Sequence, residues 1–435
     1  MRVSVADMTA WGGVVQVSGP DGVAVDGATV DSRDAGRGQL FVGIPGENVD
    51  GGMHAPEAIA RGAAAVMISP QAWAQVGPDL AVHDAVVVVA PDPVAALGRI
   101  GHGALMRLGA RVVGVTGSYG KTSTKDCVLA VLRAAGVRAE GTPGNRNTEV
   151  GVPLSILGLP DDTDVAVVEM GMRGPGQLAL LSGLAPPDVA CITAVGPVHL
   201  EILGTIEAVA AAKAEILVAL RPGGAAVVPH DAGPLEPHVA ALPQGVEVVR
   251  FGDDPAIDLD LGDLKAWERR NVAAAVAVAQ ALGLAPAPGT PVRLLRSAMR
   301  GTEHPLPGGG VLVEDCYNAN PPAMEAALAD LCRRPGRKVA VLADMLELGP
   351  DEDRYHRQVG EHAAMCGVDL LIAVGARAAS YPRGATAVES VAFPSTDDAV
   401  AGVPALIRPG DAVLVKGSRG MAMERVAEAV LEGTR

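Results

Sequence analysis

A short stretch that combines two glycines, a lysine and several hydroxyl groups, Gly117-Ser-Tyr-Gly-Lys-Thr-Ser123, has the residue types of a phosphate-binding loop. Glycines let backbone N–H groups approach an anion, a lysine reaches the terminal phosphates, and a hydroxyl can ligate the accompanying cation. The spacing is shorter than the usual G-x-x-x-x-G-K-[ST]. The order of strand, turn, lysine, hydroxyl and helix still favours a phosphate cradle over a glycine-rich turn with a chance lysine. Its candidate residues are Gly117, Ser118, Gly120, Lys121, Thr122 and Ser123.

A carboxylate and an imidazole follow two later apolar runs. Glu169 ends the run Val165-Ala-Val-Val-Glu169, and a carboxylate at the end of a buried strand is unfavourable unless it is paired or binds a cation. We therefore favour a magnesium ligand over a partner for a helix dipole at Glu169. His199 follows the run 189–194, and the residues alone leave open whether it is a ligand or an ordinary satisfied histidine.

Two polar residues lie on predicted helices. Lys213 is the one lysine of an amphipathic helix predicted over residues 206–220, where a solvent-facing lysine paired with Glu207 or Glu215 is the expected arrangement. Asn271 stands near the start of a strongly apolar helix predicted over residues 267–282. It could form a local hydrogen bond, or it could contact the edge of an adenine.

Polar residues also gather in loops after predicted strands. The loop 142–151 could be a simple connector, but its amides and hydroxyl suit a phosphate or a substrate amide, so Asn145, Asn147 and Thr148 are candidate binding residues. In the last third of the chain polar residues again follow strand ends, where doubly wound sheets bind ligands. These candidates are Asp315, Asn318, Asn320, Asp344, Glu347, Lys416, Ser418 and Arg419.

Alternating strands and helices must position these groups, which predicts an α/β protein of three domains. Residues 1–109 form a small α/β domain with expected strands over 23–30, 39–42, 63–68 and 86–90 and helices over 55–62 and 92–108. Residues 110–300 form a central P-loop-type domain with a parallel sheet of strands over 112–115, 165–169, 189–194 and 225–228. Residues 301–435 form a Rossmann-like, doubly wound domain with strands over 310–315, 338–343, 370–374 and 412–415 and helices over 323–332 and 353–366.

The composition narrows the functional classes. A chain of 435 residues is too long for one ordinary core, and a formal net charge of −15 argues against nucleic acid and anionic membranes as partners. No apolar run has the length of a membrane span and the N-terminus lacks a signal pattern, so we expect a cytoplasmic protein with small-molecule substrates. The five cysteines are scattered and form no C-x-x-C pair, which predicts reduced thiols without a metal.

Several short motifs follow one another over nearly the whole chain. They are Thr116-Gly-Ser-x-Gly-Lys-Thr-Ser-Thr-Lys125, Gly144-Asn-x-Asn-Thr148, Glu169-Met-Gly-Met172, His199-Leu-Glu201, Ala212-Lys213-x-Glu215, Asp315-x-Tyr-Asn-Ala-Asn-Pro321, Asp344-Met-x-Glu-Leu-Gly349 and Lys416-Gly-Ser-Arg419. Taken together and in this order, they resemble the motifs of the Mur ligases. Asp31-Ser-Arg33, Leu40-Phe-Val42 and Asp50-Gly51 also resemble the UDP-binding domain of that family, which makes Ser32 and Arg33 candidate substrate residues.

The resemblance implies an ATP-dependent, ADP-forming ligase that joins a carboxylate to an amine through an acyl phosphate. It is greatest to the members that add D-alanyl-D-alanine to a UDP-linked muramoyl tripeptide in peptidoglycan synthesis. It implies a monomer in which residues 1–109 bind the UDP substrate, residues 110–300 bind ATP and residues 301–435 bind the dipeptide. A paralogous amide ligase with another carboxylate and amine is one alternative, and a nucleotide-binding protein without catalysis is a second.

The resemblance also implies roles for single residues. Lys121 would hold the β- and γ-phosphates, Thr122 and Glu169 a first Mg²⁺, and His199 would lie near a second. Lys213 matches a lysine that the family often carries as a carbamate, which would turn this cation into a metal-binding carboxylate. Asn271 would contact adenine and Asp315 the ribose. The UDP-linked substrate and the γ-phosphate would meet Asn145, Asn147 and Thr148, and the dipeptide would meet Asn318, Asn320, Asp344, Glu347, Lys416, Ser418 and Arg419.

Two positions depart from the family's pattern. Trp267 stands four residues before Asn271, where the family usually has a histidine. The linker to the last domain reads Gly301-Thr302, where the family usually has Gly-Arg. Both departures concern the predicted ATP contacts and leave the phosphate and metal residues in place.

Overall fold

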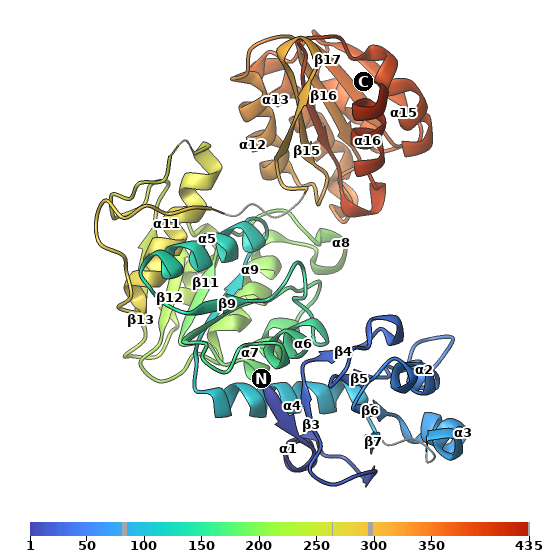
Figure 1. Cartoon of the computed structure of the whole chain (residues 1–435). Helices are drawn as coiled ribbons and strands as arrows, with labels where there is room; N and C mark the ends of the chain where they lie inside the picture. The colour runs from blue at the N-terminus through green and yellow to red at the C-terminus, as the bar shows by residue number, and fades with distance from the viewer. Residues whose placement is uncertain (81–84, 263, 295–298, 434–435) are drawn as a thin grey trace.

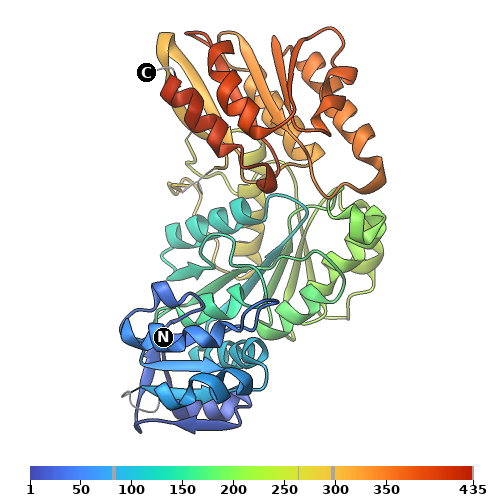
Figure 2. The same cartoon turned by 90° about the vertical axis from the view of Figure 1, so that its right-hand side faces the viewer.

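The computed structural model describes residues 1–80, 85–262, 264–294 and 299–433. Its three α/β domains follow one another in space as they do in the chain, with the N-terminal domain (blue) at one end and the C-terminal domain (orange to red) at the other (Figure 1). A view from the side shows the same order (Figure 2). The predicted fold class is confirmed. In the described part of the chain, no helix has both the length and the apolar character needed to cross a membrane.

The N-terminal domain is built on a small sheet with the strand order β2-β7-β6-β5-β4. Its strands are β2 (Gln16–Ser18), β4 (Ala28–Thr29), β5 (Leu40–Val42), β6 (Ala65–Ile68) and β7 (Val86–Val89), and only β2 runs antiparallel to its neighbour. A separate antiparallel pair joins β1 (Arg2–Ser4) to β3 (Ala24–Asp26). The helices are α1 (Val5–Gly12), α2 (Ala55–Ala60), α3 (Pro70–Leu80) and α4 (Pro93–Leu108).

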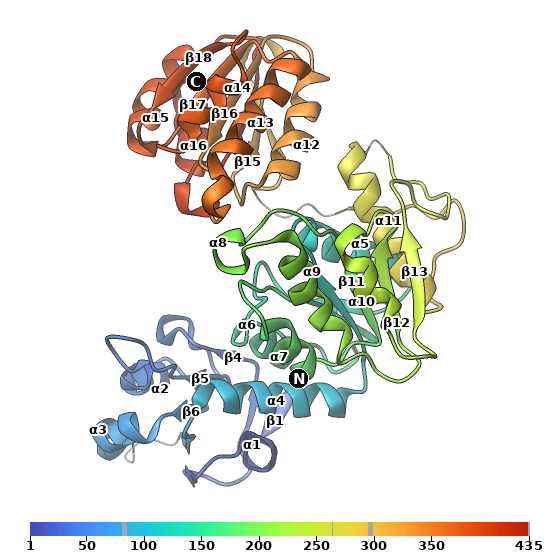
Figure 3. The same cartoon turned by 180° about the vertical axis from the view of Figure 1, so that it is seen from behind.

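The helix α4 connects this domain to the next. Asp92 caps its start, Pro93 occupies the first helical turn, and Gly109 ends it with a φ of 71°. Its apolar side packs against α6 (Gly151–Leu157) of the central domain, and one apolar cluster continues from the first domain into the second. Figure 3 shows α4 lying along the base of the central domain.

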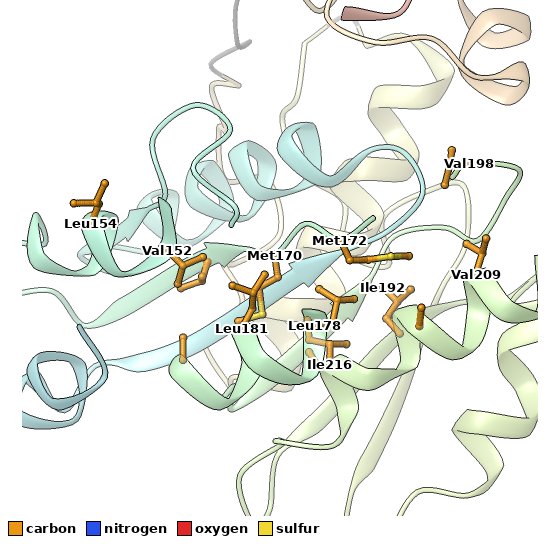
Figure 4. Packing of buried hydrophobic residues seen from close by; sticks show 14 of the residues in the cluster. Val152, Leu154, Met170, Met172, Leu178, Leu181, Ile192, Val198, Val209 and Ile216 are labelled. Atoms are coloured by element: carbon orange, nitrogen blue, oxygen red, sulfur yellow. The ribbon is translucent and has the colours of Figure 1, made fainter. Parts of the chain in front are cut away.

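The central domain has a sheet of parallel strands in the order β13-β12-β11-β8-β10-β9. They are β8 (Arg111–Thr116), β9 (Ala139–Gly141), β10 (Val165–Glu169), β11 (Val189–Ile192), β12 (Ala225–Pro229) and β13 (Glu247–Phe251). Alternate residues of each strand face opposite sides of the sheet, so these apolar runs need helices on both faces. The helices α5 (Lys121–Ala134) and α11 (Ala266–Ala281) cover one face. The helices α6, α7 (Gln177–Leu184) and α9 (Ile206–Ala214) cover the other, where Met170, Leu178, Leu181, Ile192 and Ile216 pack together (Figure 4).

The C-terminal domain has the strand order β14-β15-β19-β16-β17-β18, with β14 antiparallel at one edge. The strands are β14 (Thr302–Leu306), β15 (Gly310–Asp315), β16 (Lys338–Ala343), β17 (Leu370–Val374), β18 (Glu389–Phe393) and β19 (Ala412–Lys416). The helices α12 (Pro321–Cys332) and α13 (Glu352–Cys366) cover one face, and α15 (Thr396–Gly402) and α16 (Glu424–Gly433) cover the other. The sheet is therefore doubly wound.

The predicted central strands of all three sheets are present, whereas several edge strands and several helices were not predicted. The predicted strands 165–169, 310–315, 338–343 and 370–374 agree with the structure at both ends. The strands without a prediction are β1, β2, β9, β13, β14 and β18. The helices without a prediction are α1, α3, α6, α7, α8 (Leu200–Leu203), α10 (Glu236–Ala240), α14 (Tyr381–Gly384) and α15. The helix predicted over 206–220 ends at Ala214 and continues as a 3-10 turn over Glu215–Leu217. The domain boundary expected near residue 300 adjoins residues 295–298, which lie outside the described residues.

Candidate active site

The predicted phosphate cradle joins β8 to α5 and is held by neighbouring backbone. A Cβ atom at Gly117 would lie 1.9 Å from the Thr193 hydroxyl oxygen, so only glycine fits at that position. Gly120 has a φ of 80° and stands at the N-terminus of α5. The Ser118 hydroxyl accepts a hydrogen bond of 3.0 Å from the Gly196 N–H. The loop therefore opens onto the positive end of a 14-residue helix, which is a favourable place for a phosphate.

Lys121 and Thr122 are the first residues of that helix. The Lys121 ammonium donates to the Gly117 carbonyl at 2.8 Å. Burial lowers the pKa of Lys121, the carboxylate of Glu169 raises it, and the charge of Arg300 lowers it. Thr122 is buried, and its hydroxyl oxygen accepts a hydrogen bond of 2.9 Å from Arg300.

Glu169 ends β10 and is 1% exposed. One carboxylate oxygen, Oε1, accepts a hydrogen bond of 2.8 Å from the Asn147 side-chain amide. The other oxygen, Oε2, is buried and has no hydrogen-bond partner among the residues that the structure describes. An orphaned carboxylate oxygen is unfavourable in a protein interior unless a cation joins it. This observation fits a metal ligand at Glu169.

Lys213 is 1% exposed, which excludes the predicted solvent-facing arrangement. The reason is that α9 has no polar side there, since Val209, Ala212 and Ala214 are buried as well. Glu215 accepts a hydrogen bond of 2.7 Å from the Gly176 N–H. Burial, and then the charge of Lys121, lower the pKa of Lys213 well below 10.5. Within the described part of the chain, the Lys213 amine has no hydrogen bond and no ion pair.

A cavity of about 1090 Å³ lies between the central and C-terminal domains and brings most candidates together. Its walls include residues from the cradle, from the loop 142–151, from α11 and from the start of α12. The predicted residues that line it are Ser118, Gly120, Lys121, Thr122, Ser123, Asn145, Asn147, Thr148, Glu169, His199, Asn271, Asp315, Asn318, Asn320 and Lys416. Gly117 forms the backbone of the cradle, and Lys213 is buried close enough to Lys121 for the two charges to interact.

His199 faces the C-terminal domain. Its Nδ1 lies 2.5 Å from Glu347 Oε2, and the contact lowers the pKa of Glu347. Both residues have a positive φ, 54° for His199 and 63° for Glu347. The helix α8 (Leu200–Leu203), which follows His199, contacts the turn Gly349–Asp351. Figure 3 shows α8 on the side of the central domain that faces the C-terminal domain.

Besides Glu347, three candidates of the C-terminal domain do not line the cavity. Asp344 is 4% exposed and accepts a hydrogen bond of 2.7 Å from the Ala378 N–H. Ser418 accepts one of 2.9 Å from the Leu346 N–H. Arg419 forms an ion pair of 2.7 Å with Glu424. These side chains stabilise loops at the carboxyl ends of β16 and β19.

The other C-terminal candidates form the cavity wall through contacts of their own. Asn320 is the N-cap of α12 and accepts a hydrogen bond of 3.1 Å from the Ala323 N–H. Lys416 is 2% exposed, forms an ion pair of 2.7 Å with Asp315, and donates to the Asn318 carbonyl at 2.9 Å.

Ser32 and Arg33 lie in the N-terminal domain, away from this cavity. The Ser32 hydroxyl donates to Glu57 at 2.8 Å. Arg33 is exposed and forms an ion pair of 2.6 Å with Asp31, which lowers the pKa of Asp31 to about 2.

The sequence interpretation missed several cations in the cavity wall. Of these, Arg270 pairs with Asp231 at 2.5 Å and Lys265 with Asp330 at 3.2 Å. Arg300 instead contacts the neutral Thr122 hydroxyl and lies 3.8 Å from the centre of the Tyr317 ring. Its signal in the sequence was an arginine one position before Gly301. A guanidinium without a carboxylate partner in the described residues is suited to a phosphate.

Comparison with protein-family models gives three matches. Residues 24–103 match "Mur ligase family, catalytic domain", residues 115–278 match "Mur ligase middle domain", and residues 299–419 match "Mur ligase, glutamate ligase domain".

Curated proteins and solved structures agree with these matches. The chain is 32% identical to the UDP-N-acetylmuramoyl-tripeptide--D-alanyl-D-alanine ligase of Bacillus subtilis, over 94% of this chain and 93% of the relative. It is 30% identical to the Escherichia coli ligase of the same name, over 96% of both. A crystal structure of MurF from Acinetobacter baumannii superimposes with a TM-score of 0.85 at 25% identity, over 99% of both chains. MurF from Thermotoga maritima in complex with ADP gives 0.77 at 27% identity, over 94% of this chain and 98% of that one.

Proposed function

The chain belongs to the Mur ligase family, and we propose that it uses ATP to add D-alanyl-D-alanine to UDP-N-acetylmuramoyl-tripeptide in peptidoglycan synthesis. The curated relatives that cover nearly the whole chain carry the name of that reaction. The observation that carries the proposal is the single cavity that joins the phosphate cradle, the free oxygen of Glu169 and polar residues of the C-terminal domain.

The chemistry requires that a carboxylate be activated before an amine can attack it. The γ-phosphoryl group of ATP passes to a carboxylate oxygen of the peptide, which leaves ADP and an acyl phosphate. The dipeptide amine then forms a bond to the acyl carbon, loses a proton, and phosphate departs with the electrons of the broken C–O bond. Positioning and charge neutralisation contribute most to such a transfer. We assign the neutralisation to Lys121 and Arg300 and the positioning of the γ-phosphate to the cradle backbone.

The residues present fit a magnesium ion. Bound Mg²⁺ would neutralise phosphate charge, and Thr122 and Glu169 Oε2 are the groups that would hold it. No cluster of three His, Cys, Asp or Glu side chains suited to a metal occurs in residues 1–80, 85–262, 264–294 and 299–433. Mg²⁺ usually keeps several waters and takes phosphate oxygens together with one or two protein ligands, so a small protein ligand set suits it.

For a second ion we propose His199 and a carbamate on Lys213. An amine whose pKa is lowered by burial is nucleophilic near neutral pH, and its nitrogen can attack CO₂ to give a carbamate with loss of a proton. The carbamate would place a negative charge beside Lys121 in a region where the described residues leave the Lys213 amine unpaired.

We propose further contacts from the cavity wall. Asn271 would contact adenine, and its Oδ1 already accepts a hydrogen bond of 3.2 Å from Thr124 beside the cradle. Asp315 would contact the ribose, and Asn145, Asn147 and Thr148 the UDP-linked substrate and the γ-phosphate. Asn318, Asn320 and Lys416 would meet the dipeptide, and Glu347 would act next to His199. Asp344, Ser418 and Arg419 would support that region through their loops, and Ser32 and Arg33 would meet the uridine nucleotide.

The remaining proposals concern the assembly and the domains. Because one chain supplies every wall of the cavity, we propose a monomer, with the UDP substrate on residues 1–109, ATP on residues 110–300 and the dipeptide on residues 301–435. We place it in the cytoplasm because the reaction consumes ATP.

The test is phosphate release from ATP and Mg²⁺ with UDP-muramoyl tripeptide and D-alanyl-D-alanine, added separately and then together, with the product mass determined. Release that requires both substrates and yields the pentapeptide nucleotide supports the proposal. If other carboxylate and amine pairs alone are ligated, the chain is a paralogous amide ligase. ATP binding without any acyl-phosphate formation would show a nucleotide-binding protein.

A further inference from the structure

The buried ammonium of Lys125 has no place in the chemistry assigned so far. Lys125 lies on α5 one turn after the cradle lysine, is 3% exposed, and does not line the cavity. Its Nζ donates to the Thr142 carbonyl at 2.9 Å and lies 3.2 Å from the Asp126 carboxylate. A buried cation is unfavourable unless its contacts compensate for lost hydration, so this lysine holds Thr142 firmly.

Thr142 connects this lysine to the candidate metal carboxylate. The Thr142 hydroxyl oxygen accepts a hydrogen bond of 3.1 Å from the Glu169 N–H, and the Thr142 N–H donates to Val167 at 3.1 Å. Thr142 is itself 3% exposed. The cation on α5 therefore fixes the backbone of β10 at the residue that carries the carboxylate.

The loop that begins at Thr142 returns to the same carboxylate. Five residues later, Asn147 donates to Glu169 Oε1 at 2.8 Å, and its carbonyl accepts a hydrogen bond of 2.8 Å from the Gly171 N–H. One carboxylate oxygen is thereby fixed, and the other is buried and has no partner in the described part of the chain. The orientation of the free oxygen depends on both ends of the loop 142–147.

We propose that Lys125 and Thr142 are positioning residues that aim the free oxygen of Glu169 at the nucleotide-bound divalent cation. Neither side chain lines the cavity, and both act through Glu169 and Asn147. The inference rests on the proposed function for the identity of the ligand and goes beyond it by naming what sets the geometry of the metal site. Side chains that orient metal ligands usually change metal affinity about 10- to 100-fold when they are removed.

The experiment measures Mn²⁺ binding to the ADP complex of the full chain by electron paramagnetic resonance, with metal-free ADP binding and thermal unfolding recorded in parallel. Lys125→Met keeps the length of the side chain and removes its charge. Thr142→Val keeps the shape and removes the acceptor for the Glu169 N–H, whereas Thr142→Ser retains that acceptor. Arg133→Met is the matched control, since Arg133 also lies on α5 and also donates, at 2.9 Å, to a carbonyl of the same segment, that of Ala139.

We expect Lys125→Met and Thr142→Val to weaken Mn²⁺ binding about 10- to 100-fold while metal-free ADP binding is retained. Hydrogen exchange in the loop 142–148 should also become faster in both. Thr142→Ser and Arg133→Met should stay near the parent value. Unchanged Mn²⁺ affinity in Lys125→Met and Thr142→Val, even with a lower unfolding temperature, would overturn the proposal and leave a purely structural role.

Two further outcomes keep the test decisive. If Lys125→Met does not fold, the comparison of Thr142→Val with Thr142→Ser decides, because equal Mn²⁺ affinity in these two variants also overturns the proposal. If the parent protein binds no ADP and no Mn²⁺, the proposed nucleotide site is wrong. If the parent and all variants bind both equally well, the nucleotide site stands and only the positioning role of Lys125 and Thr142 is wrong.

Discussion

Replacing Lys213 would reveal the chemical state of a deeply buried amine beside the phosphate cradle. An unmodified amine at this position has lost its hydration, and in the described residues it has gained no partner. Lys213→Met fills nearly the same volume without the polar atom, so it should raise the free energy of unfolding by about 1–3 kcal/mol. If Lys213 instead carries a carbamate paired with Lys121, Lys213→Met should lower the free energy of unfolding, because the methionine then removes a favourable charge interaction.

The dependence of stability on pH distinguishes the same two states. The folded-state pKa of an unmodified Lys213 lies below its ordinary value of 10.5. Between these two pKa values the unfolded chain binds more protons than the folded chain, so the free energy of unfolding rises with pH and the full gain is reached above 10.5. Lys213→Met should remove this rise, and carbamylation of the parent protein should remove it too. Denaturant unfolding across that pH range, with and without bicarbonate, measures the effect.

The rate of turnover is a third measurement that depends on whether Lys213 carries a carbamate. Loss of one preorganised charge from a water-poor site costs about 10²- to 10³-fold in kcat, and we expect a loss of that order in Lys213→Ala. Acetate or formate can enter the space left by the side chain and should restore part of the rate, whereas Lys213→Met fills that space and should not respond. The assay is phosphate release with both substrates present. Parent-like rates in Lys213→Ala without added carboxylate would refute the carbamate, as would a Lys213→Met variant with full activity.

Three further predictions concern residues in or beside the cavity. Lys121→Ala should lower turnover by at least about 10²-fold with little change in thermal unfolding, since its charge serves the phosphates; near-normal phosphate release would contradict the cradle assignment. Arg300→Met should weaken ADP binding about tenfold or more, because a hydrogen bond to a charged group contributes about 1.5–3 kcal/mol, while calorimetry on Arg269→Met, outside the cavity, should show no change. Glu347→Gln should raise the KM for the dipeptide by no more than about fivefold and leave the KM for ATP unchanged. The effect is small because a partly exposed pair such as His199–Glu347 contributes about 0.2–1 kcal/mol. Equal changes in the two KM values would argue against a role of Glu347 in binding the dipeptide.

The sequence is informative where one physical requirement decides the structure. Buried parallel strands need continuous apolar runs, so β10, β15, β16 and β17 are recognisable from their residues alone. Edge strands have no such requirement. The strand β13 has exposed residues at Glu247 and Val248, and β18 has only exposed and half-buried residues, so their composition differs little from that of loops. The missed strands are mostly of this kind.

The surroundings of a side chain could be predicted only where a residue type has few alternatives. A carboxylate at the end of a buried strand has few, and Glu169 is placed as expected. A lysine on a helix has many alternatives. The local pattern predicted that Lys213 faces solvent, because the pattern contains no information on what packs against α9. Asp344 and Ser418 were predicted to bind substrate because they follow strand ends. Their side-chain oxygens instead accept hydrogen bonds from backbone N–H groups of neighbouring loops and do not face the cavity. Only the folded arrangement separates these two uses of the same residue types.

Trp267, one of the two departures from the family's pattern, lies beside Gly301, the first residue of the linker that carries the other. Gly301 has a φ of 73°, and a Cβ atom placed on it would lie 3.8 Å from the Trp267 ring and 3.8 Å from Lys265 Nζ. The unusual tryptophan and the unusual linker therefore share one wall of the cavity, which Arg300 also lines. When the sequence is compared with the family's pattern position by position, a histidine is missing at Trp267 and an arginine is missing at Thr302. In the structure the Trp267 ring lies beside Gly301, and the guanidinium of the preceding residue, Arg300, donates to the Thr122 hydroxyl. The cavity thus keeps a linker cation at the cradle, although the sequence places it one residue before the glycine rather than one residue after it.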